Sequence, residues 1–583
     1  MSDPYYLGLA TTFHDPAMAI VGPDGAVLFA EAAERHLQYK RAPNCEAAPI
    51  SRLPGLLKRY VPRDADIVVA TSWGARFVRT LGKAAEAGLM GHESVSTAQA
   101  GLNRSFVPDR TERALVANLH HLQAAAGLSV QVAADRIGAT GTVTLRRYPH
   151  HLTHAAYGFR SAGWPEAAGL VVDGMGERGA AALFAPGEDG VPVEVHQYRG
   201  PMSLGFFFGL ITELCGFDPV KGEEWKVMGL APYGRSDPEL RALVDRMWTV
   251  EDGVPASAPV DSITGAATAL EGLRPADAVR EGWADLARVG QDTFEAMMDL
   301  LVADAHRRVP TGDLVLTGGC ALNSSYNGKL VARSPFSRLH VPSAPADDGN
   351  AIGAALLALA EDGKARGAAG GTARAAPFLS PYLGSEVDDA PLERMAAWEP
   401  RLEKAGPAVV ARAARALAEG KLVGWVQGRA EFGPRALGNR SILADPRPAD
   451  AKAALNAKVK YREAFRPFAP AILDDAGPDW FEDYQDSPYM ERTLRWKPHA
   501  RAAVPAVVHE DGTGRLQSVR ADRNGRFCEL IAAFAAITGV PILLNTSFNV
   551  MGKPILHSTE DALAMFATTG IEVLVVNDWI MEK

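Results

Sequence analysis

Short apolar runs that end in glycine, polar or acidic residues recur through the first half of the chain. Three of them predict strands near the N-terminus, at residues 5–12, 17–21 and 26–30. The segment GPDG at residues 22–25 predicts a tight turn between the last two. Two similar runs, at residues 169–173 and 314–317, are each followed by glycines, as in buried strands that deliver loops to a cleft. This pattern predicts an α/β fold made of two similar halves, although the sequence shows no clear repeat.

The pattern changes after residue 360. Residues 361–376 read EDGKARGAAGGTARAA, which is rich in glycine and alanine and lacks bulky apolar side chains, as is typical of a linker. The 583 residues also exceed what one hydrophobic core usually sustains. We therefore predict a first domain over residues 1–365, a linker over 366–376 and a second α/β domain over 377–583.

Composition narrows the class of protein. Hydrophobic residues make up 47% and charged residues 22% of the chain, as in a globular enzyme. The net charge of −9 argues against nucleic acid as a partner. The four cysteines form no CxxC pair, which gives no sign of a disulfide framework or a thiolate zinc site. We see neither a signal peptide nor a membrane span, and we expect a cytoplasmic protein, with a homodimer left open.

One stretch inverts the charge of the chain. Residues 429–470 carry nine Lys and Arg residues against four acidic ones. These cations are interleaved with glycine, proline and aromatic residues, among them Pro434 and Phe432, which is typical of a folded site rather than a disordered tail. Guanidinium and ammonium groups in such a frame suit phosphorylated ligands. The alternative is a solvated basic face with surface ion pairs; we favour the site.

Two histidines and two acids could hold a metal ion. His150 and His154 are spaced i, i+4, which puts both imidazoles on one face of a helix. Asp173 ends a buried strand, where its carboxylate needs a partner. Asp347 is a fourth candidate, but helix capping is its alternative role and Asp348 competes with it. This ligand set suits iron(II), manganese or zinc, whereas two histidines alone are more often core or capping residues.

For the other candidate site residues, a structural role is as simple an explanation as a functional one. Gly318 and Gly319 let backbone amides approach a phosphate, or form a plain turn. His14, at a bend between two strands, is either a proton acceptor or a structural residue that Asp15 holds. Lys226 either contacts a ligand or pairs with a neighbouring glutamate. Asn545 follows an apolar run and either donates to an oxyanion or caps a turn.

Four motifs follow one another along the chain: HHLTHAAYGF from His150, EEWKVMGLAPYG from Glu223, the basic stretch, and PILLNTSFNVMGKPI from Pro541. Together they resemble the O-carbamoyltransferase family of antibiotic and nodulation-factor biosynthesis. The resemblance implies a duplicated actin-like (ASKHA, RNase H-like) domain followed by a YrdC-like α/β domain. This chain has Asp15-Pro16-Ala17 where many members of the family have D-S-A. The proline leaves the hydrogen bonding of this turn open.

The resemblance also implies roles for particular residues. His14 would be the base that accepts the proton of a hydroxyl. The metal ligands would be His150, His154, Asp173 and Asp347, with iron(II) as the ion. The adenylate would lie by Gly174, Gly176, Lys226, Gly318, Gly319 and Asn323. Carbamoyl phosphate and ATP, with Mg²⁺, would bind Arg435, Lys460, Arg466, Arg515 and Asn545. His509 is similar in position to a family histidine, or is structural.

The implied reaction has two steps. Carbamoyl phosphate and ATP give carbamoyl-adenylate, and the carbamoyl group then passes to a hydroxyl of a small-molecule natural product. The sequence does not identify this acceptor; we expect its specificity in loops such as residues 75–105. Two alternatives are a tRNA-modifying transferase, as among the ASKHA relatives, and a non-catalytic actin-like scaffold that depends on ATP.

Overall fold

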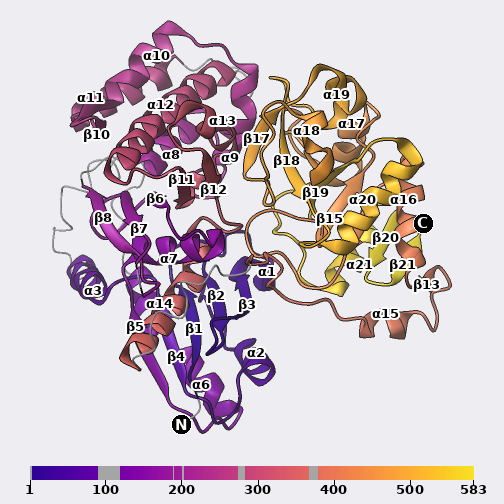
Figure 1. The fold of residues 1–583 in the computed structure, drawn as a ribbon, viewed down its shortest axis with the longest axis horizontal. Helices are drawn as coiled ribbons and strands as arrows, with labels where there is room; N and C mark the ends of the chain where they lie inside the picture. Colours follow the sequence, from indigo (N-terminus) through magenta and orange to yellow (C-terminus); the bar gives the residue numbers. More distant parts are fainter. Residues whose placement is uncertain (1–2, 90–117, 188, 200–202, 274–282, 367–377) are drawn as a thin grey trace. The chain divides into compact units, whose positions relative to one another are not determined.

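The computed structural model describes the chain except residues 1–2, 90–117, 188, 200–202, 274–282 and 367–377. The chain divides into two compact units (Figure 1). The first comprises Met1–Glu34, Arg41–Leu322 and Leu330–Leu379. The second comprises Arg35–Lys40, Asn323–Lys329 and Ser380–Lys583. The predicted linker, residues 366–376, lies outside the described residues except for its first residue.

The first unit contains two five-stranded sheets with the same topology. Their strand orders are β3-β2-β1-β4-β5 and β8-β7-β6-β11-β12. In each sheet the first three strands in sequence pair antiparallel, and the other two run parallel to the first. The strands of the first sheet are β1 (Tyr5–Ala10), β2 (Ala17–Val21), β3 (Val27–Ala32), β4 (Ile67–Thr71) and β5 (Val143–Arg147). Those of the second are β6 (Ala168–Val172), β7 (Ala181–Ala185), β8 (Val193–Tyr198), β11 (Asp313–Thr317) and β12 (Arg338–His340). The predicted duplication is confirmed.

The strands agree closely with the apolar runs. β2 has the predicted bounds, and every residue of β2 and of β6 is buried, which explains why both runs are continuously apolar. The tight turn is also confirmed: Gly25 has φ 82° and its amide donates to the Gly22 carbonyl over 3.0 Å. β1 ends at Ala10, two residues earlier than predicted, because the chain then bends toward His14.

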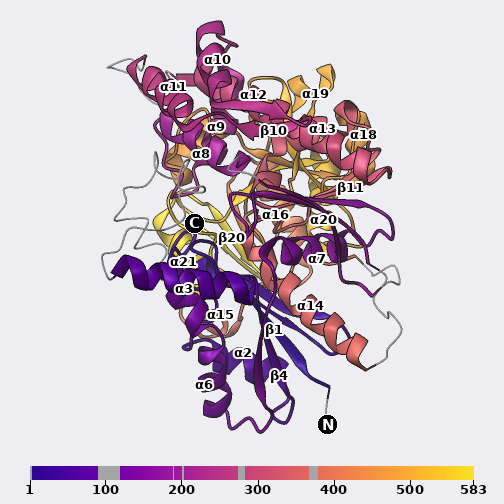
Figure 2. The same cartoon turned by 90° about the vertical axis from the view of Figure 1, so that its left-hand side faces the viewer.

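Two helices of the first unit lie side by side, α7 (His150–Ala162) and α14 (Asn350–Ala365) (Figures 1 and 2). Glycine makes this close packing possible. A Cβ on Gly353 of α14 would lie 1.9 Å from the carbonyl oxygen of Thr153 on α7, and one on Gly8 of β1 would lie 1.7 Å from the Ala351 carbonyl oxygen. The helix pair therefore brings the start of α7 and the segment before α14 together.

The remaining elements of the first unit complete its two halves. The longest described helix, α12 (Ala284–Arg308), packs against α8 (Leu204–Leu214) and α9 (Glu224–Leu230). Further helices among the described residues of this unit are α2 (Leu53–Tyr60), α3 (Ala75–Leu89), α6 (Leu128–Arg136), α10 (Pro238–Val244) and α11 (Val260–Gly272). A small sheet pairs β9 (Trp248–Glu251) with β10 (Val254–Ser257).

The second unit is built on a nine-stranded mixed sheet, ordered β13-β21-β20-β14-β15-β19-β16-β18-β17. Its strands are β13 (Leu402–Lys404), β14 (Val423–Val426), β15 (Arg440–Ala444), β16 (Ala469–Leu473), β17 (Arg492–Arg495), β18 (Thr513–Val519), β19 (Ile542–Ser547), β20 (Val573–Val576) and β21 (Trp579–Glu582). Its helices are α15 (Ala390–Met395), α16 (Ala408–Ala418), α17 (Ala451–Leu455), α18 (Gly477–Trp480), α19 (Pro498–Ala503), α20 (Gly525–Thr538) and α21 (Thr559–Thr568). This α/β architecture agrees with the predicted class; its likeness to YrdC stays a prediction.

Two segments that lie within the sequence range of the first unit are assigned to the second unit. Residues 35–40 overlap α1 (Ala33–Leu37), and residues 323–329 overlap α13 (Ser324–Arg333). Within the second unit, the guanidinium of Arg35 donates to the Gly433 carbonyl over 2.6 Å, and the Asn327 amide donates to the Glu491 carbonyl over 2.9 Å. Long-range contacts of this kind leave no local pattern in the sequence.

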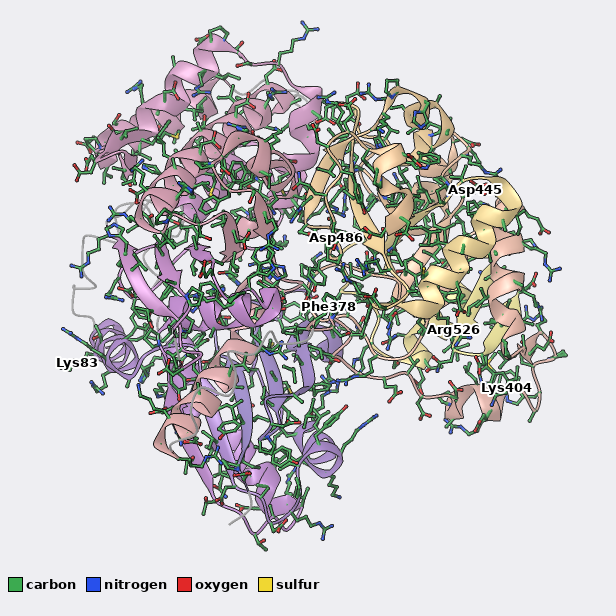
Figure 3. The ribbon with its side chains drawn as sticks, viewed as in Figure 1. Lys83, Phe378, Lys404, Asp445, Asp486 and Arg526 are labelled. Atoms are coloured by element: carbon green, nitrogen blue, oxygen red, sulfur yellow. The ribbon has the colours of Figure 1, made fainter. Side chains whose placement is uncertain are left out.

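The prediction of a loop over residues 75–105 is wrong for its first part. Residues 75–89 form helix α3, on which the labelled Lys83 is exposed (Figure 3), and the rest lies outside the described residues. In the described part of the chain, no helix combines the length and the apolar character needed to cross a membrane.

Candidate functional sites

The start of α7 carries the two predicted histidine ligands of the first unit. Pro149 precedes the helix, and the Glu177 carboxylate accepts the first amide, that of His150, over 2.9 Å. A carboxylate at this position also complements the helix dipole. The Trp73 ring stacks on the His150 imidazole with 4.2 Å between centroids. One turn later, His154 is fully buried on the same face of α7.

Two carboxylates meet these imidazoles. Asp173 directly follows β6, and Asp347 begins the short helix η5 (Asp347–Gly349) ahead of α14. His150 Nε2 lies 3.0 Å from Asp173 Oδ2 and 3.4 Å from Asp347 Oδ1. His154 Nε2 lies 3.6 and 3.5 Å from the same two oxygens. Four buried ligand atoms thus lie within 4.8 Å of one another.

Hydrogen bonds around this His/Asp cluster orient the ligands. His150 Nδ1 lies 3.2 Å from the Ser72 carbonyl oxygen, which can only accept, so Nδ1 carries a proton, and Nε2, which would give up its own proton to a metal, is the nitrogen available as a ligand. The Gly319 amide donates to Asp173 Oδ1 over 3.0 Å. Burial lowers the pKa of His150, but hydrogen bonds to Asp173 and Asp347 outweigh it and raise the pKa to about 10. Burial raises the pKa of Asp347, yet the imidazoles hold it below its ordinary value.

The structure separates Asp347 from its neighbour Asp348. Asp347 Oδ1 faces both imidazoles, whereas the described contacts of Asp348 Oδ1 include its own helix, where it accepts from the Gly349 amide over 3.1 Å. Burial, with Asp15, Glu34 and Asp347 nearby, raises the pKa of Asp348 to about 8. A carboxyl that is protonated near neutral pH is a poor metal ligand, so Asp347 is the better candidate.

The donor set fits a divalent transition metal. Two imidazole nitrogens and two carboxylate oxygens converge, all four residues are buried, and a divalent cation would offset the charge of the two ionised carboxylates in place of the protons on the imidazoles. This donor set would leave positions open for a substrate oxygen on a metal that takes more than four ligands. It does not by itself select iron(II) over manganese or zinc.

His14 lies in the bend after β1, where the predicted base was expected. Its Nδ1 is 3.0 Å from Asp15 Oδ2. Burial raises the pKa of Asp15, but Arg41 and His14 together lower it to about 2. The Asp15 carboxylate therefore accepts, and the His14 proton sits on Nδ1. His14 Nε2 is then an acceptor, on a side chain that is 39% exposed and accessible to a substrate.

Most of the residues predicted to surround an adenylate make other contacts. A Cβ on Gly318 would lie 2.2 Å from the Val172 carbonyl oxygen, and one on Gly176 would lie 2.5 Å from the His151 ring, so both glycines permit close packing. The Lys226 ammonium pairs with Glu223 at 2.5 Å, the simpler of its two explanations. Asn323 accepts the Tyr326 amide over 3.1 Å as a helix cap and is assigned to the second unit. Gly174 has open space beside it, because a Cβ added there would meet its nearest neighbour, the Phe206 ring, only at 3.9 Å.

The second unit gathers the predicted phosphate-binding cations on one site. Burial lowers the pKa of Arg435 to about 10. Burial, and then the charges of Arg435, Arg462 and Arg466, hold the pKa of Arg515 well below its usual range, and its Nε is buried without a partner among the described residues. Lys460 is affected in the same way by burial, Arg462 and Arg466. Lys460 is buried and the arginines are half-buried, and repulsion among cations held this close together is typical of a site that binds an anion.

Two local structures present these cations. The buried Glu431 carboxylate accepts three backbone amides, from Leu437 over 2.8 Å, Asn439 over 2.8 Å and Arg440 over 3.0 Å, which fixes the loop that carries Arg435. Residues 456–460 form a π-helix, a rare element that is frequent at functional sites, with Lys460 at its end. The Lys460 ammonium donates to the Asn549 side chain over 2.7 Å.

Two acceptors lie among these donors. The Asn545 amide donates to Gln517 over 2.8 Å and to the Ala436 carbonyl, which leaves its buried Oδ1 without a partner among the described residues. Thr513 Oγ1 lies 2.6 Å from Asp511, which takes the hydroxyl proton, so His509 Nδ1 must donate to Thr513 over 3.2 Å. His509 Nε2 is then a buried acceptor. Burial, with Arg515 and Lys452 nearby, lowers its pKa to about 4.

Comparison with known proteins identifies the family of this chain. The model of the carbamoyltransferase N-terminus matches residues 5–254 and 277–356, and that of the carbamoyltransferase C-terminus matches residues 414–583. The chain belongs to the carbamoyltransferase family. The resemblance read from the motifs is thereby confirmed, and the protein is an enzyme of the transferase class.

Individual members of the family match most of the chain. Nodulation protein NolNO of Sinorhizobium fredii is 37% identical over 439 residues, which cover 74% of this chain and 63% of that protein. The 3'-hydroxymethylcephem-O-carbamoyltransferase of Amycolatopsis lactamdurans is 31% identical over 403 residues, 67% of this chain and 72% of that protein. Among solved structures, component A of (R)-2-hydroxyglutaryl-CoA dehydratase from Acidaminococcus fermentans covers 61% of this chain and 98% of its own, with 12% identity and a TM-score of 0.31.

Some functional candidates in this carbamoyltransferase escaped the sequence analysis. Arg41 contacts Asp15, which lies 26 positions earlier in the sequence. No motif marks Arg41. Glu431 was counted merely as an acid in the basic stretch, although its position just before FGPRALGN, a run with two glycines, suggests a carboxylate that organises a loop. Glu177 and Ser72, which hold His150, come from segments without a pattern of their own.

Proposed function

We propose that the chain is an ATP-dependent O-carbamoyltransferase that works in two steps, one in each unit. The observation that carries the proposal is the cluster of one buried lysine and several half-buried arginines in the second unit, which suits phosphate groups, in a chain whose first unit holds the His/Asp cluster. Family membership supplies the carbamoyl chemistry, and one relative named as a cephem O-carbamoyltransferase supports a hydroxyl acceptor.

The first step is assigned to the second unit. Carbamoyl phosphate loses its phosphate to water, and an oxygen of the resulting carbamate attacks the α-phosphorus of ATP. Pyrophosphate leaves, and carbamoyl-adenylate forms. Arg435, Lys460, Arg466 and Arg515 offset the charge on the phosphates, with Mg²⁺ on ATP. Asn545 Oδ1 and His509 Nε2 are acceptors that suit the amino group of the carbamoyl moiety, because the four cations can only donate.

The second step is assigned to the first unit. An acceptor hydroxyl attacks the carbamoyl carbon, its proton moves to His14 Nε2, and AMP leaves with the electrons of the broken bond. The products are a carbamate ester and AMP. His150, His154, Asp173 and Asp347 would hold the divalent metal, iron(II) by the family resemblance, which when bound supplies Lewis acidity toward the carbamoyl oxygen. Adenylation is needed because carbamate itself is a poor electrophile.

The direct test uses carbon-labelled carbamoyl phosphate with ATP and Mg²⁺. The proposal predicts release of pyrophosphate that depends on carbamoyl phosphate, together with labelled carbamoyl-adenylate. A panel of hydroxylated natural products, which includes a 3'-hydroxymethylcephem, then identifies the acceptor by transfer of label. Cleavage of ATP to ADP alone, without label on the nucleotide, would contradict the first step.

A further inference from the structure

A strained segment surrounds the His14–Asp15 pair in the first unit. Asp15 and Arg41 have φ values of 55° and 59°, in the left-handed region that side chains other than glycine seldom adopt. Ala42 and Asn44 also have positive φ, at 41° and 58°. The Asp15 amide donates to the Arg41 carbonyl over 2.7 Å, and the Asn44 amide donates to the Phe13 carbonyl over 3.0 Å. Strain of this kind persists where the surrounding contacts impose it, and it is common at functional sites.

Arg41 is the centre of these contacts. Its Nε and Nη2 lie 3.0 and 2.9 Å from Asp15 Oδ2, the same oxygen that faces His14 Nδ1. Its backbone amide donates to Glu34 over 2.8 Å, and its Nη1 donates to the Pro219 carbonyl over 3.3 Å. The side chain is 17% exposed. The guanidinium is thus fixed at several points and has little freedom to leave Asp15.

The loop before α9 is shaped to accept this side chain. Gly222 has φ 67°, and a Cβ there would lie 2.8 Å from both Cδ and Nη1 of Arg41. Any larger residue at position 222 would displace the guanidinium. The bend after β1, the segment from Arg41 to Asn44 and the loop before α9 therefore meet at one arginine, which no sequence motif singled out.

We infer that Arg41 is a positioning residue for carbamoyl transfer: it anchors the Asp15 carboxylate, which in turn holds His14 with its proton on Nδ1 and Nε2 directed to the acceptor hydroxyl. This inference rests on the proposed role of His14. Without Arg41, Asp15 is free to rotate away, and the imidazole can take the opposite tautomer, with a proton on the nitrogen that must accept one. A wrong tautomer disables a general base even where the ring stays in place.

The tautomer of His14 is the decisive readout, since it requires neither acceptor nor turnover. Nitrogen-15 spectra of protein labelled in its histidine rings distinguish Nδ1–H from Nε2–H, and His14→Asn identifies the His14 signals. We expect the Nδ1–H form in the natural protein, a mixture in Arg41→Gln, and restoration in Arg41→Lys or on addition of guanidinium to Arg41→Gly. Arg146→Gln, which removes a half-buried arginine paired with Asp362 at 2.7 Å, is the matched control and should leave the tautomer unchanged.

Kinetics then separate positioning from folding. With supplied carbamoyl-adenylate, AMP release by Arg41→Gln should fall roughly 10- to 100-fold in kcat with little change in KM, as for the loss of a residue that orients a functional group. Pyrophosphate release from carbamoyl phosphate and ATP should stay unchanged. An unaltered His14 tautomer in a folded Arg41→Gln protein would overturn the inference, as would a rise in KM alone. If instead His14→Asn transfers normally, the proposed base is wrong, whatever Arg41 does.

Discussion

Arg515 offers the sharpest test of the phosphate site, because its removal should weaken binding and strengthen the fold. The guanidinium on β18 is repelled by Arg435, Arg462 and Arg466 and is buried at its Nε. At an effective dielectric constant of about 20, a phosphate oxygen about 4 Å away gains about 4 kcal/mol from one such cation. Partial loss of hydration offsets some of this, so we expect Arg515→Met to lose about 3 kcal/mol of phosphate binding, a roughly 100-fold effect.

The same substitution should stabilise the protein without ligand. Like charges about 8 Å apart repel by about 2 kcal/mol at that dielectric constant, and methionine removes this repulsion while it keeps much of the apolar stem. The assays are the KM for carbamoyl phosphate in pyrophosphate release, titration with inorganic pyrophosphate by calorimetry, and thermal unfolding of the apo protein. Arg495→Met, on the neighbouring strand β17 and 54% exposed, is the control.

Two results would refute this reasoning. If Arg515→Met binds pyrophosphate as the natural protein does, the cations serve some purpose other than phosphate binding. If it unfolds at a lower temperature than Arg495→Met, then Arg515 contributes to the fold, and the repulsion inferred for the site is absent.

Two further predictions concern the metal cluster and the pH dependence of stability. Elemental analysis should find one divalent metal per chain, lost in the double variant His150→Ala/His154→Ala and in Asp347→Asn but kept in Asp348→Asn; full occupancy in the double variant would exclude the site. Because the folded-state pKa of His509 is about 4 and that of an unfolded histidine is about 6.5, the unfolded chain binds more protons between these values. Stability should therefore fall by up to about 3 kcal/mol as the pH drops through this window, and urea unfolding of His509→Phe should lack this part of the slope; identical pH profiles for the two proteins would contradict it.

The features that could be predicted from the sequence are those that a local pattern of residues encodes. β2 and β6 were visible because burial on both faces demands a continuous apolar run, and His150 and His154 were visible because helical spacing is regular. The duplication of the first unit was expected from its strands, but no repeat in the sequence records it, since only burial and topology are shared by the two sheets. The assignment of residues 35–40 and 323–329 to the second unit depends on long-range contacts such as that of Arg35, which no local pattern reveals.

Some chemical roles of the site residues could not be predicted either, because they depend on contacts between residues that are distant in the sequence. The choice of Asp347 over Asp348 required the burial of both side chains and the position of the imidazoles. The tautomers of His14 and His509 follow from their partners, Asp15 and Thr513, and the second of these requires the further contact to Asp511. Gly176 and Gly318, which were expected beside an adenylate, also permit close packing, and a glycine motif cannot distinguish this role from ligand binding.

The division of labour between the two units is tested most directly with two variants and supplied carbamoyl-adenylate. We predict that Arg466→Ala no longer releases pyrophosphate from ATP and carbamoyl phosphate, yet releases AMP from supplied carbamoyl-adenylate and passes its carbamoyl group to the acceptor. His14→Asn should do the reverse, with normal pyrophosphate release and slow transfer, by a factor of about 10² to 10⁴ for the loss of a general base. Failure of supplied carbamoyl-adenylate to restore any transfer in Arg466→Ala would contradict two separable steps.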